Sequence, residues 1–289
     1  MTSRESAITF SCGGDRLIGI LHQPADPGSC GVVVVVGAPQ YRVGSHRQYL
    51  LLARDLAEQG FPVLRFDYRG MGDSDGDFAG FEAVDDDIHA AIDALCHHVP
   101  DLDRIALWGL CDGASAISFF AAKDPRVKDV VLINPWVRTE ETLARAEIGG
   151  YYAVRLLSKA FWGRLLSGKI DVFRSVADLL GKLRLALART PSGGASNAAA
   201  TASLPQRVAA SLRAFEGRSL LVLSGRDLTA QEFESAVLSS KAMTAWSRRP
   251  EVSIRKLEGA NHTYAKQAWR RTVHDWTVEQ LRKGETEAA

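Results

Sequence analysis

The chain has 289 residues, of which 46% are hydrophobic and 24% are charged, and its formal net charge is +1. These values are ordinary for a globular protein and give no reason to expect a nucleic-acid partner. The four cysteines form no CxxC pair and no zinc-ligand spacing, so we expect no disulfide framework and no metal site. We expect a cytoplasmic protein, because no secretory signal or membrane-spanning stretch is evident.

Strand and helix patterns alternate along most of the chain. A hairpin comes first, with strands over residues 8–11 and 16–22 joined by two glycines. Strands of the buried type are predicted at 31–36, 62–66, 104–108, 127–133, 219–224 and 252–257, and helices at 46–59, 81–97, 114–122, 232–245 and 266–282. This alternation predicts an α/β fold, with a mostly parallel central sheet and helices on both faces.

The alternation stops between residues 139 and 208, where the pattern is helical and ends in a small, polar stretch. We therefore predict a core domain over 1–138 and 209–289, interrupted by a helical cap insertion over 139–208. Tyr152 and Trp162 of the cap are candidate substrate contacts, although such aromatics can equally pack the cap onto the core. Basic residues interleaved with them leave peripheral membrane contact as a lesser alternative.

The segment Gly109-Leu-Cys-Asp-Gly113 has the pattern of a nucleophile between two glycines. It follows a predicted strand and precedes a predicted helix, which is the context in which this turn exposes a nucleophile. The glycines let the strand and the helix approach closely, and the helix N-terminus favours a thiolate. We therefore predict Cys111 as the nucleophile, the alternative being a buried structural cysteine.

A cysteine nucleophile needs a base, and the base needs an acid to orient it. In this class of fold the chain order is nucleophile, acid, histidine. Asp227 and His262 follow in that order, each just past the end of a predicted strand. We predict them as the acid and the base. Asp112 is the rival acid, but it lies beside the nucleophile and out of order.

Two backbone N–H groups are expected to hold the oxyanion: those of Asp112 and Ala38. Ala38 is preferred in the loop after the first buried strand because the next residue is a proline and has no N–H. Gln40 is a side-chain alternative, and His46 is a candidate substrate contact. The glycine-rich turn over 67–74 is expected to be structural, with Arg69 and Asp73 forming a pair.

These motifs resemble the α/β-hydrolase superfamily over nearly the whole chain. The resemblance is carried by Gly109 to Gly113, by the Asp67-x-Arg-Gly-x-Gly-x-Ser74 turn and by Gly259-Ala-Asn-His262. More narrowly, the loop from Gly37 to Gln48 together with the cysteine motif resembles exosortase A system-associated hydrolases, type 1. That resemblance implies a bacterial cytoplasmic enzyme linked to exopolysaccharide and exosortase loci. A cysteine in this position is also similar to dienelactone hydrolase.

The function predicted is cleavage of a small-molecule ester or thioester through a Cys-His-Asp triad and an acyl-enzyme. One alternative is an acyltransferase that passes the acyl group to a sugar or another acceptor. The other is a catalytically silent binding protein. No cofactor or metal is implied. The sequence leaves open the acyl group, the leaving group, the acceptor and the oligomeric state.

Overall fold

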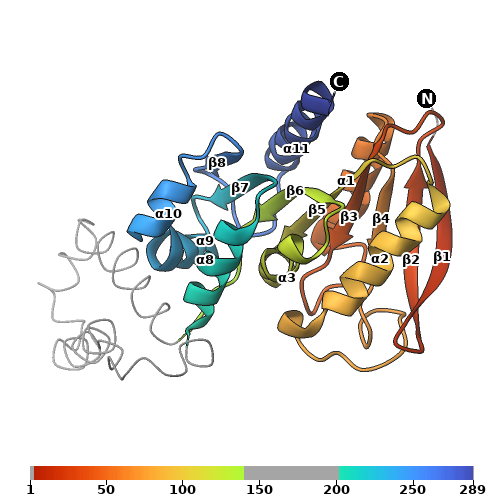
Figure 1. The fold of residues 1–289 in the computed structure, drawn as a ribbon, viewed down its shortest axis with the longest axis horizontal. Helices are drawn as coiled ribbons and strands as arrows, with labels where there is room; N and C mark the ends of the chain where they lie inside the picture. Colours follow the sequence, from red (N-terminus) through yellow and green to blue (C-terminus); the bar gives the residue numbers. More distant parts are fainter. Residues whose placement is uncertain (1–2, 140–201, 289) are drawn as a thin grey trace, which may run out of the picture.

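A computed structural model describes residues 3–139 and 202–288. Eight strands form one sheet in the order β1-β2-β4-β3-β5-β6-β7-β8 (Figure 1). The pairs β1/β2 and β2/β4 are antiparallel, and the remaining neighbours are parallel. The strands are β1 (Arg4–Cys12), β2 (Asp15–Gln23), β3 (Cys30–Val35), β4 (Val63–Phe66), β5 (Arg104–Leu110), β6 (Val127–Ile133), β7 (Arg218–Ser224) and β8 (Val252–Leu257). The predicted mostly parallel sheet is confirmed.

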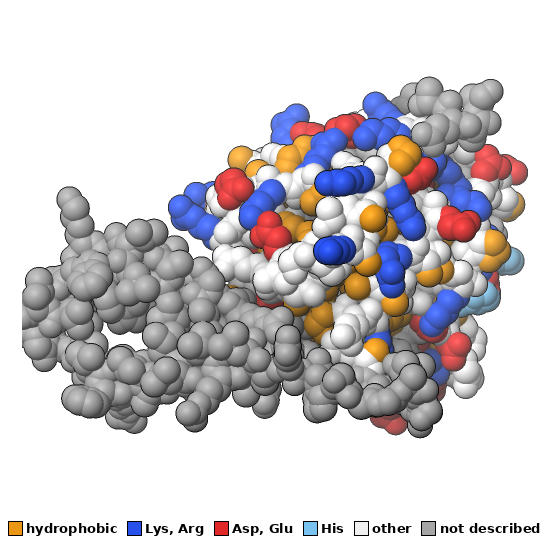
Figure 2. Space-filling view, turned by 60° about the vertical axis from the view of Figure 1, so that its left-hand side comes forward, with side chains coloured by type: hydrophobic (Ala, Val, Ile, Leu, Met, Phe, Trp, Pro, Cys, Tyr) orange, Lys and Arg blue, Asp and Glu red, His pale blue; other side chains and the backbone are white. Residues whose placement is uncertain are grey.

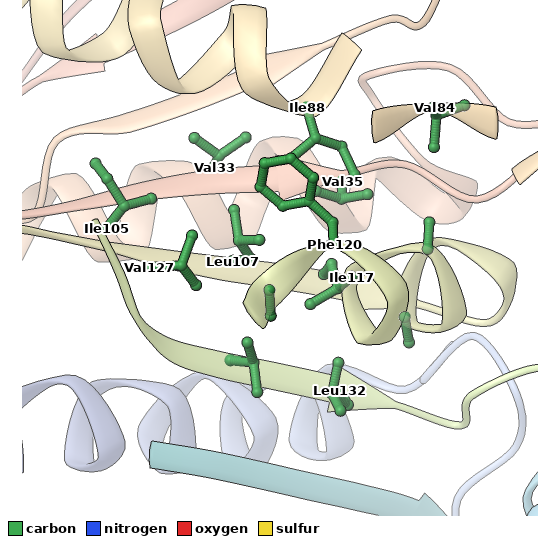
Figure 3. Packing of buried hydrophobic residues seen from close by; sticks show 14 of the residues in the cluster. Val33, Val35, Val84, Ile88, Ile105, Leu107, Ile117, Phe120, Val127 and Leu132 are labelled. Carbon is green, nitrogen blue, oxygen red and sulfur yellow. The ribbon is translucent and has the colours of Figure 1, made fainter. Parts of the chain in front are cut away.

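Helices cover both faces of the sheet, as predicted. One face carries α1 (Gln48–Glu58) and α11 (Gln267–Ala288), whose buried residues pack with one set of strand side chains. The other face carries α2 (Asp85–His98), α3 (Asp112–Phe120) and α8 (Leu204–Ala214). Because successive strand residues point to opposite faces, Val33 and Val35 pack on this second face, whereas Val32 and Val34 pack on the first (Figure 3).

Three predicted helices begin or continue differently in the structure. Residues 46–59 do not form one helix: the 3₁₀ turn η1 (Ser45–Arg47) comes first, and His46 and Arg47 have positive φ angles. A second 3₁₀ turn, η2 (Phe81–Ala83), precedes α2. The helix predicted at 232–245 is divided into α9 (Leu228–Phe233), the π-helical turn η5 (Glu234–Leu238) and α10 (Lys241–Trp246). Ser240 caps α10 by accepting the Met243 N–H, which restarts the helix there.

The predicted cap over 139–208 lies mostly outside the described residues, so its division from the core stays a prediction. The chain is described again from residue 202, and α8 packs Val208 and Leu212 into the core beside α3. Among the described residues, no helix is both long and apolar enough to cross a membrane. Figure 2 shows a face on which Lys and Arg side chains are interspersed with apolar and acidic ones.

Candidate active site

Cys111 lies at the sharp turn between β5 and α3, at the carboxyl edge of the sheet. Its backbone has φ 61° and ψ −125°, a conformation that a non-glycine residue adopts only when its surroundings impose it. The Cys111 N–H donates to the Ile133 carbonyl at 2.9 Å, and the Cys111 carbonyl accepts the Trp136 N–H at 3.1 Å. These bonds fix the turn to β6, and the side chain is left partly exposed.

The glycines of this turn are required by close packing. A Cβ at position 113 would lie 2.5 Å from the Val35 carbonyl oxygen, and one at position 109 would lie 2.8 Å from the Gly113 carbonyl carbon. Both distances are shorter than van der Waals contact, so a side chain at either position would force the strand and the helix apart. The local sequence therefore fits the turn that the pattern predicted.

Asp227 and His262 lie in the loops after β7 and β8, and their side chains are in direct contact. His262 Nδ1 and Asp227 Oδ2 are 2.8 Å apart. Asp227 is buried and also caps α9, because its carboxylate accepts the N–H groups of Thr229 and Ala230, each at 3.3 Å. These bonds fix the position of the carboxylate, which in turn orients the imidazole.

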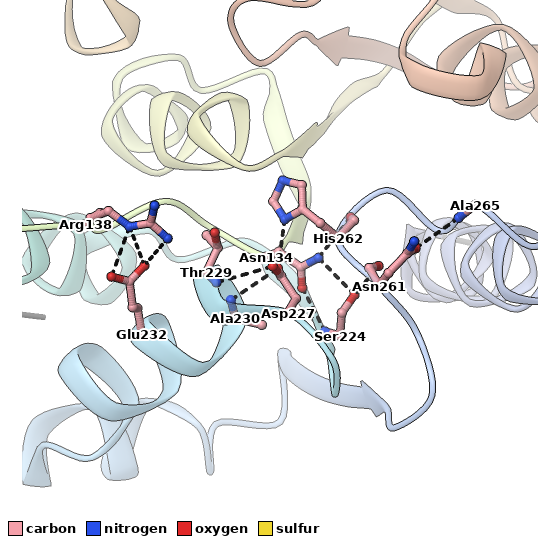
Figure 4. A network of polar contacts seen from close by, with 10 residues as sticks. All are labelled: Asn134, Arg138, Ser224, Asp227, Thr229, Ala230, Glu232, Asn261, His262 and Ala265. Carbon is pink, nitrogen blue, oxygen red and sulfur yellow. Dashed lines mark hydrogen bonds and ion pairs between the residues drawn. The ribbon is translucent and has the colours of Figure 1, made fainter. Parts of the chain in front are cut away.

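A buried asparagine connects the loop of His262 to the sheet (Figure 4). Asn134 follows β6 and is fully buried, with a φ of 44°. Its amide donates to Ser224 Oγ at 3.0 Å and to the His262 carbonyl at 3.3 Å, while its oxygen accepts the Ser224 N–H at 2.8 Å. Ser224 Oγ donates to the Asn261 carbonyl at 3.1 Å. Two residues that carry no reactive group thus hold the histidine loop in place.

The surroundings of His262 stabilise its protonated form. Burial lowers the pKa of His262, but hydrogen bonds with Asp227 and with the Cys111 side chain outweigh burial and raise the pKa to about 10. The same interactions connect the cysteine of one loop with the histidine of the other. His262 thus bonds to Asp227 and interacts with Cys111, a pairing from which a nucleophile can be activated.

The two predicted oxyanion donors are connected by a side chain. The Ala38 N–H donates to Asp112 Oδ2 at 3.1 Å, so this amide already has a partner. Asp112 Oδ1 accepts the Gly113 N–H at 3.1 Å. The carboxyl group thus lies between the loop after β3 and the N-terminus of α3. This contact could not be predicted from the sequence.

The predicted substrate-contact residues have different positions. Gln40 Oε1 accepts the Ser45 N–H at 3.0 Å, so its side chain closes the loop in which both residues lie. His46 is exposed on η1. Tyr152 and Trp162 fall outside the described residues. All four stay predictions as substrate contacts.

The turn over residues 67–74 does not contain the expected pair of Arg69 and Asp73. Arg69 instead pairs with Asp87 of α2 at 2.8 Å. Asp73 pairs with Arg42 at 2.6 Å, and Arg42 also pairs with the buried Asp67. The prediction was wrong because the partners come from elements distant in sequence. Through these ion pairs the turn is bound both to the loop after β3 and to α2.

A groove of about 760 Å³ runs between α1 and α11. It is lined by charged side chains, including Arg270, Arg271 and the paired Asp55 and His274. Neither Cys111 nor His262 borders it, so we do not assign it to the reaction. Among the described residues, no group of three or more His, Cys, Asp and Glu side chains is placed to hold a metal ion.

Solved structures similar to this chain support the fold. An esterase from Pyrococcus furiosus aligns with a TM-score of 0.64 and 16% identity, covering 97% of this chain and 91% of its own. A proline iminopeptidase from Mycobacterium smegmatis aligns with a TM-score of 0.60 and 16% identity, covering 98% of this chain and 100% of its own. At this identity the likeness shows the fold alone.

A curated relative from Escherichia coli, described as an uncharacterized 31.7 kDa protein in the traX-finO intergenic region, is 38% identical over 82 residues. The match covers 27% of this chain and 29% of the relative, so the chain spans less than a third of that relative's length. The family model for the serine aminopeptidases, S33, matches residues 32–191, which is more than half of the chain. The chain therefore belongs to the serine aminopeptidase S33 family, within the α/β-hydrolase superfamily.

Proposed function

We propose that the protein cleaves an ester or thioester through a covalent acyl-enzyme on Cys111. The observation that carries this proposal is the position of Cys111. It occupies the strained turn at the N-terminus of α3, and the paired side chains of His262 and Asp227 lie beside it. The family is named for a serine nucleophile. A cysteine at the same turn can carry out the same reaction, because sulfur attacks a carbonyl carbon as oxygen does.

In the proposed reaction, His262 accepts the Cys111 proton and the sulfur attacks the carbonyl carbon. The pair of electrons of the C=O bond moves to oxygen, which hydrogen bonds near the N-terminus of α3 stabilise. Collapse of this intermediate releases the leaving group, to which His262 returns the proton. Water then attacks the thioester with His262 as base, and the acid leaves. Asp227 holds the imidazole in the tautomer that these steps require.

The pKa of His262 is consistent with this role. Its rise to about 10 means that the imidazolium is stabilised beside Asp227 and Cys111. That stabilisation favours the imidazolium that forms when His262 accepts the proton from sulfur. Of the two predicted oxyanion donors, the backbone N–H of Asp112 is kept in the proposal, whereas the Ala38 N–H donates to the Asp112 carboxyl.

The test is a panel of p-nitrophenyl esters and acyl-CoA thioesters of increasing chain length, with intact mass measured during turnover. Wild type should give an acyl adduct that Cys111→Ala lacks, and turnover should fall by at least about 10³-fold in the variant. Cys30→Ala, which removes a buried thiol far from the turn, is the matched control. Unchanged turnover in Cys111→Ala would overturn the mechanism. A sugar acceptor in the same assay separates acyl transfer from hydrolysis.

The family name favours a second candidate, cleavage of an amide at an N-terminal residue. Aminoacyl p-nitroanilides added to the panel decide between the two. Turnover of these amides faster than the esters would favour the peptidase.

We further propose that the enzyme acts in an exosortase and exopolysaccharide system. This rests on the resemblance of the Gly37 to Gln48 loop and of the cysteine motif. Deleting the gene in its bacterium and measuring acyl groups on the secreted polysaccharide tests the link. An unchanged polysaccharide would count against it.

A further inference from the structure

The carboxyl group of Asp112 lies where an oxyanion site is expected. Oδ2 accepts the Ala38 N–H and Oδ1 accepts the Gly113 N–H, each at 3.1 Å. The loop makes room for this group, because a Cβ at position 37 would lie 2.4 Å from Oδ1. The Ala38 N–H, one of the two backbone donors expected to bind an oxyanion, is thus bound to the Asp112 carboxyl group.

A negatively charged carboxylate at this place would oppose the reaction. The tetrahedral intermediate carries its charge on the former carbonyl oxygen, and like charges a few ångströms apart in a partly buried site repel. A neutral carboxyl group has the opposite effect, since its O–H is a hydrogen-bond donor. The charge state of Asp112 therefore decides whether the site repels the oxyanion or stabilises it.

The surroundings of Asp112 shift its titration so that the neutral form persists up to about pH 6. Burial raises the pKa of Asp112 to about 6, although the N–H groups of Ala38 and Gly113 oppose this shift and His262 lowers it. The other groups that face it are Cys111, Tyr49 of α1 and Tyr68 after β4. Both tyrosine hydroxyls are buried; the Tyr49 hydroxyl interacts with the Gly37 backbone, and no hydrogen-bond partner is found for the Tyr68 hydroxyl within the described part of the chain. Apart from His262, no cation faces Asp112 among these groups.

We propose that Asp112 is a catalytic residue that, in its neutral form, donates a hydrogen bond from its carboxyl O–H to the tetrahedral oxyanion. The Ala38 N–H then holds the carboxyl group rather than the substrate. The inference deepens the proposed function and depends on Cys111 being the nucleophile. Asp112 keeps its proton in this step: His262 accepts the Cys111 proton, the sulfur–carbon bond forms, the π electrons move to oxygen, and that oxygen accepts the hydrogen bond from Asp112 until the intermediate collapses.

The test compares wild type with Asp112→Asn over pH 5 to 8.5, using p-nitrophenyl butyrate at the isosbestic wavelength of its product. Asparagine keeps an acceptor for the Ala38 N–H and a donor for the oxyanion, but it cannot ionise. The ratio of the variant's kcat to that of wild type should rise by up to about tenfold per pH unit above about 6. A ratio that is constant over this range would overturn the proposal.

A second variant distinguishes hydrogen-bond donation by the Asp112 carboxyl from simple blocking of the Ala38 N–H, and a third serves as its control. Asp112→Ala should lower kcat at pH 5.5 by about 10²-fold, because one oxyanion donor is lost. A faster Asp112→Ala enzyme would mean that the carboxyl only blocks the Ala38 N–H, and the proposal would fail. Asp86→Asn, at the first turn of α2, controls for losing a helix N-terminal carboxylate and should leave kcat unchanged.

A measurement on the wild-type enzyme tests the proposal even if the variants do not fold. A substrate-like trifluoromethyl ketone adds to Cys111 and leaves an oxyanion in the site. The Asp112 carboxyl ¹³C resonance should then report a higher pKa than in the free enzyme, since the oxyanion favours the donor. An unchanged titration would overturn the proposal. If Cys111→Ala keeps full turnover, the proposed function itself fails, which is a different result from these.

Discussion

The two sides of the site are held in place by different means. On one side, the cysteine turn is fixed by backbone bonds to β6 and by close packing that leaves no room for a side chain at positions 109 and 113. On the other, His262 is positioned by side chains: Asp227 directly, and Asn134 through the loop backbone. Gly259 in that loop has no neighbour closer than 3.8 Å to an added Cβ.

Substitutions on the two sides of the site should therefore have different effects on stability and turnover. Steric positioning is lost only when the fold itself is forced apart, so changes there should cost stability and activity together. Positioning by hydrogen bonds can be removed one contact at a time without forcing the strand and the helix apart, so changes there should lower turnover by displacing His262. The following experiments would sharpen this comparison or break it.

The largest effect is expected for His262→Ala. Loss of the base should lower kcat/KM by about 10²–10⁴-fold, whereas the melting temperature should fall by only about 2–4 °C at pH 6, because the side chain is 31% exposed and its main interaction is with Asp227. Ester turnover and a thermal melt measure the two quantities. His97→Ala, on the exposed face of α2, should change neither. A loss of less than tenfold in the His262 variant would contradict the assigned role.

The next largest effect is expected for Gly113→Ala, which should lower stability. The new Cβ would lie 2.5 Å from the Val35 carbonyl oxygen, and such overpacking costs about 1–3 kcal/mol in the free energy of unfolding. Urea denaturation measures this cost. Gly259→Ala, on the histidine side, meets nothing closer than 3.8 Å and should change stability by less than about 0.5 kcal/mol. Equal costs for the two variants would break the comparison.

Asn134→Ala should have an intermediate effect. It leaves the Ser224 N–H and the His262 carbonyl without their partner, which costs about 1–3 kcal/mol per buried group left unsatisfied. We also expect kcat to fall about tenfold with KM unchanged, because the histidine loop loses its support. Steady-state kinetics test this. Asn261→Ala, whose exposed side chain accepts the Ala265 N–H, should have a smaller effect on kcat.

Asp227→Asn should change how stability depends on pH. The pKa of His262 is raised from 6.5 to about 10, so its contribution to stability is fully present below pH 6.5 and is lost as the pH rises through about 10. The melting temperature of wild type should therefore exceed that of the variant by about 2–4 °C at pH 6, and by less at pH 10. Asparagine still caps α9. A difference that does not change with pH would contradict the assignment.

Much of the fold could be predicted from the sequence because buried parallel strands are short β-branched runs, such as residues 31–36. Helix boundaries were less predictable. The start of α1 is displaced because His46 and Arg47 adopt left-handed conformations, which the apolar spacing of the helix does not record. The division of the 232–245 helix likewise depends on a π-helical turn and on the cap at Ser240.

In the site, chain order and strand ends indicated where Cys111, Asp227 and His262 would lie, because parallel strands end at one edge of the sheet. Their catalytic roles stay predictions. Contacts between side chains distant in sequence were not predictable. Asn134 carries no reactive group and has no motif, although an asparagine directly after a buried strand is a weak signal. The Ala38 and Asp112 contact depends on a side-chain rotamer that no sequence pattern specifies.

The way the cysteine turn is built bears on how such enzymes can diverge. The frame around position 111 is made of backbone bonds and glycines, and the Cys111 sulfur takes no part in these bonds. Serine and cysteine codons differ by one base, and the two side chains differ by one atom. A change of nucleophile in such a lineage therefore requires no rearrangement of the chain. The chemistry of the attack can drift by single mutations while the architecture that presents it is inherited unchanged.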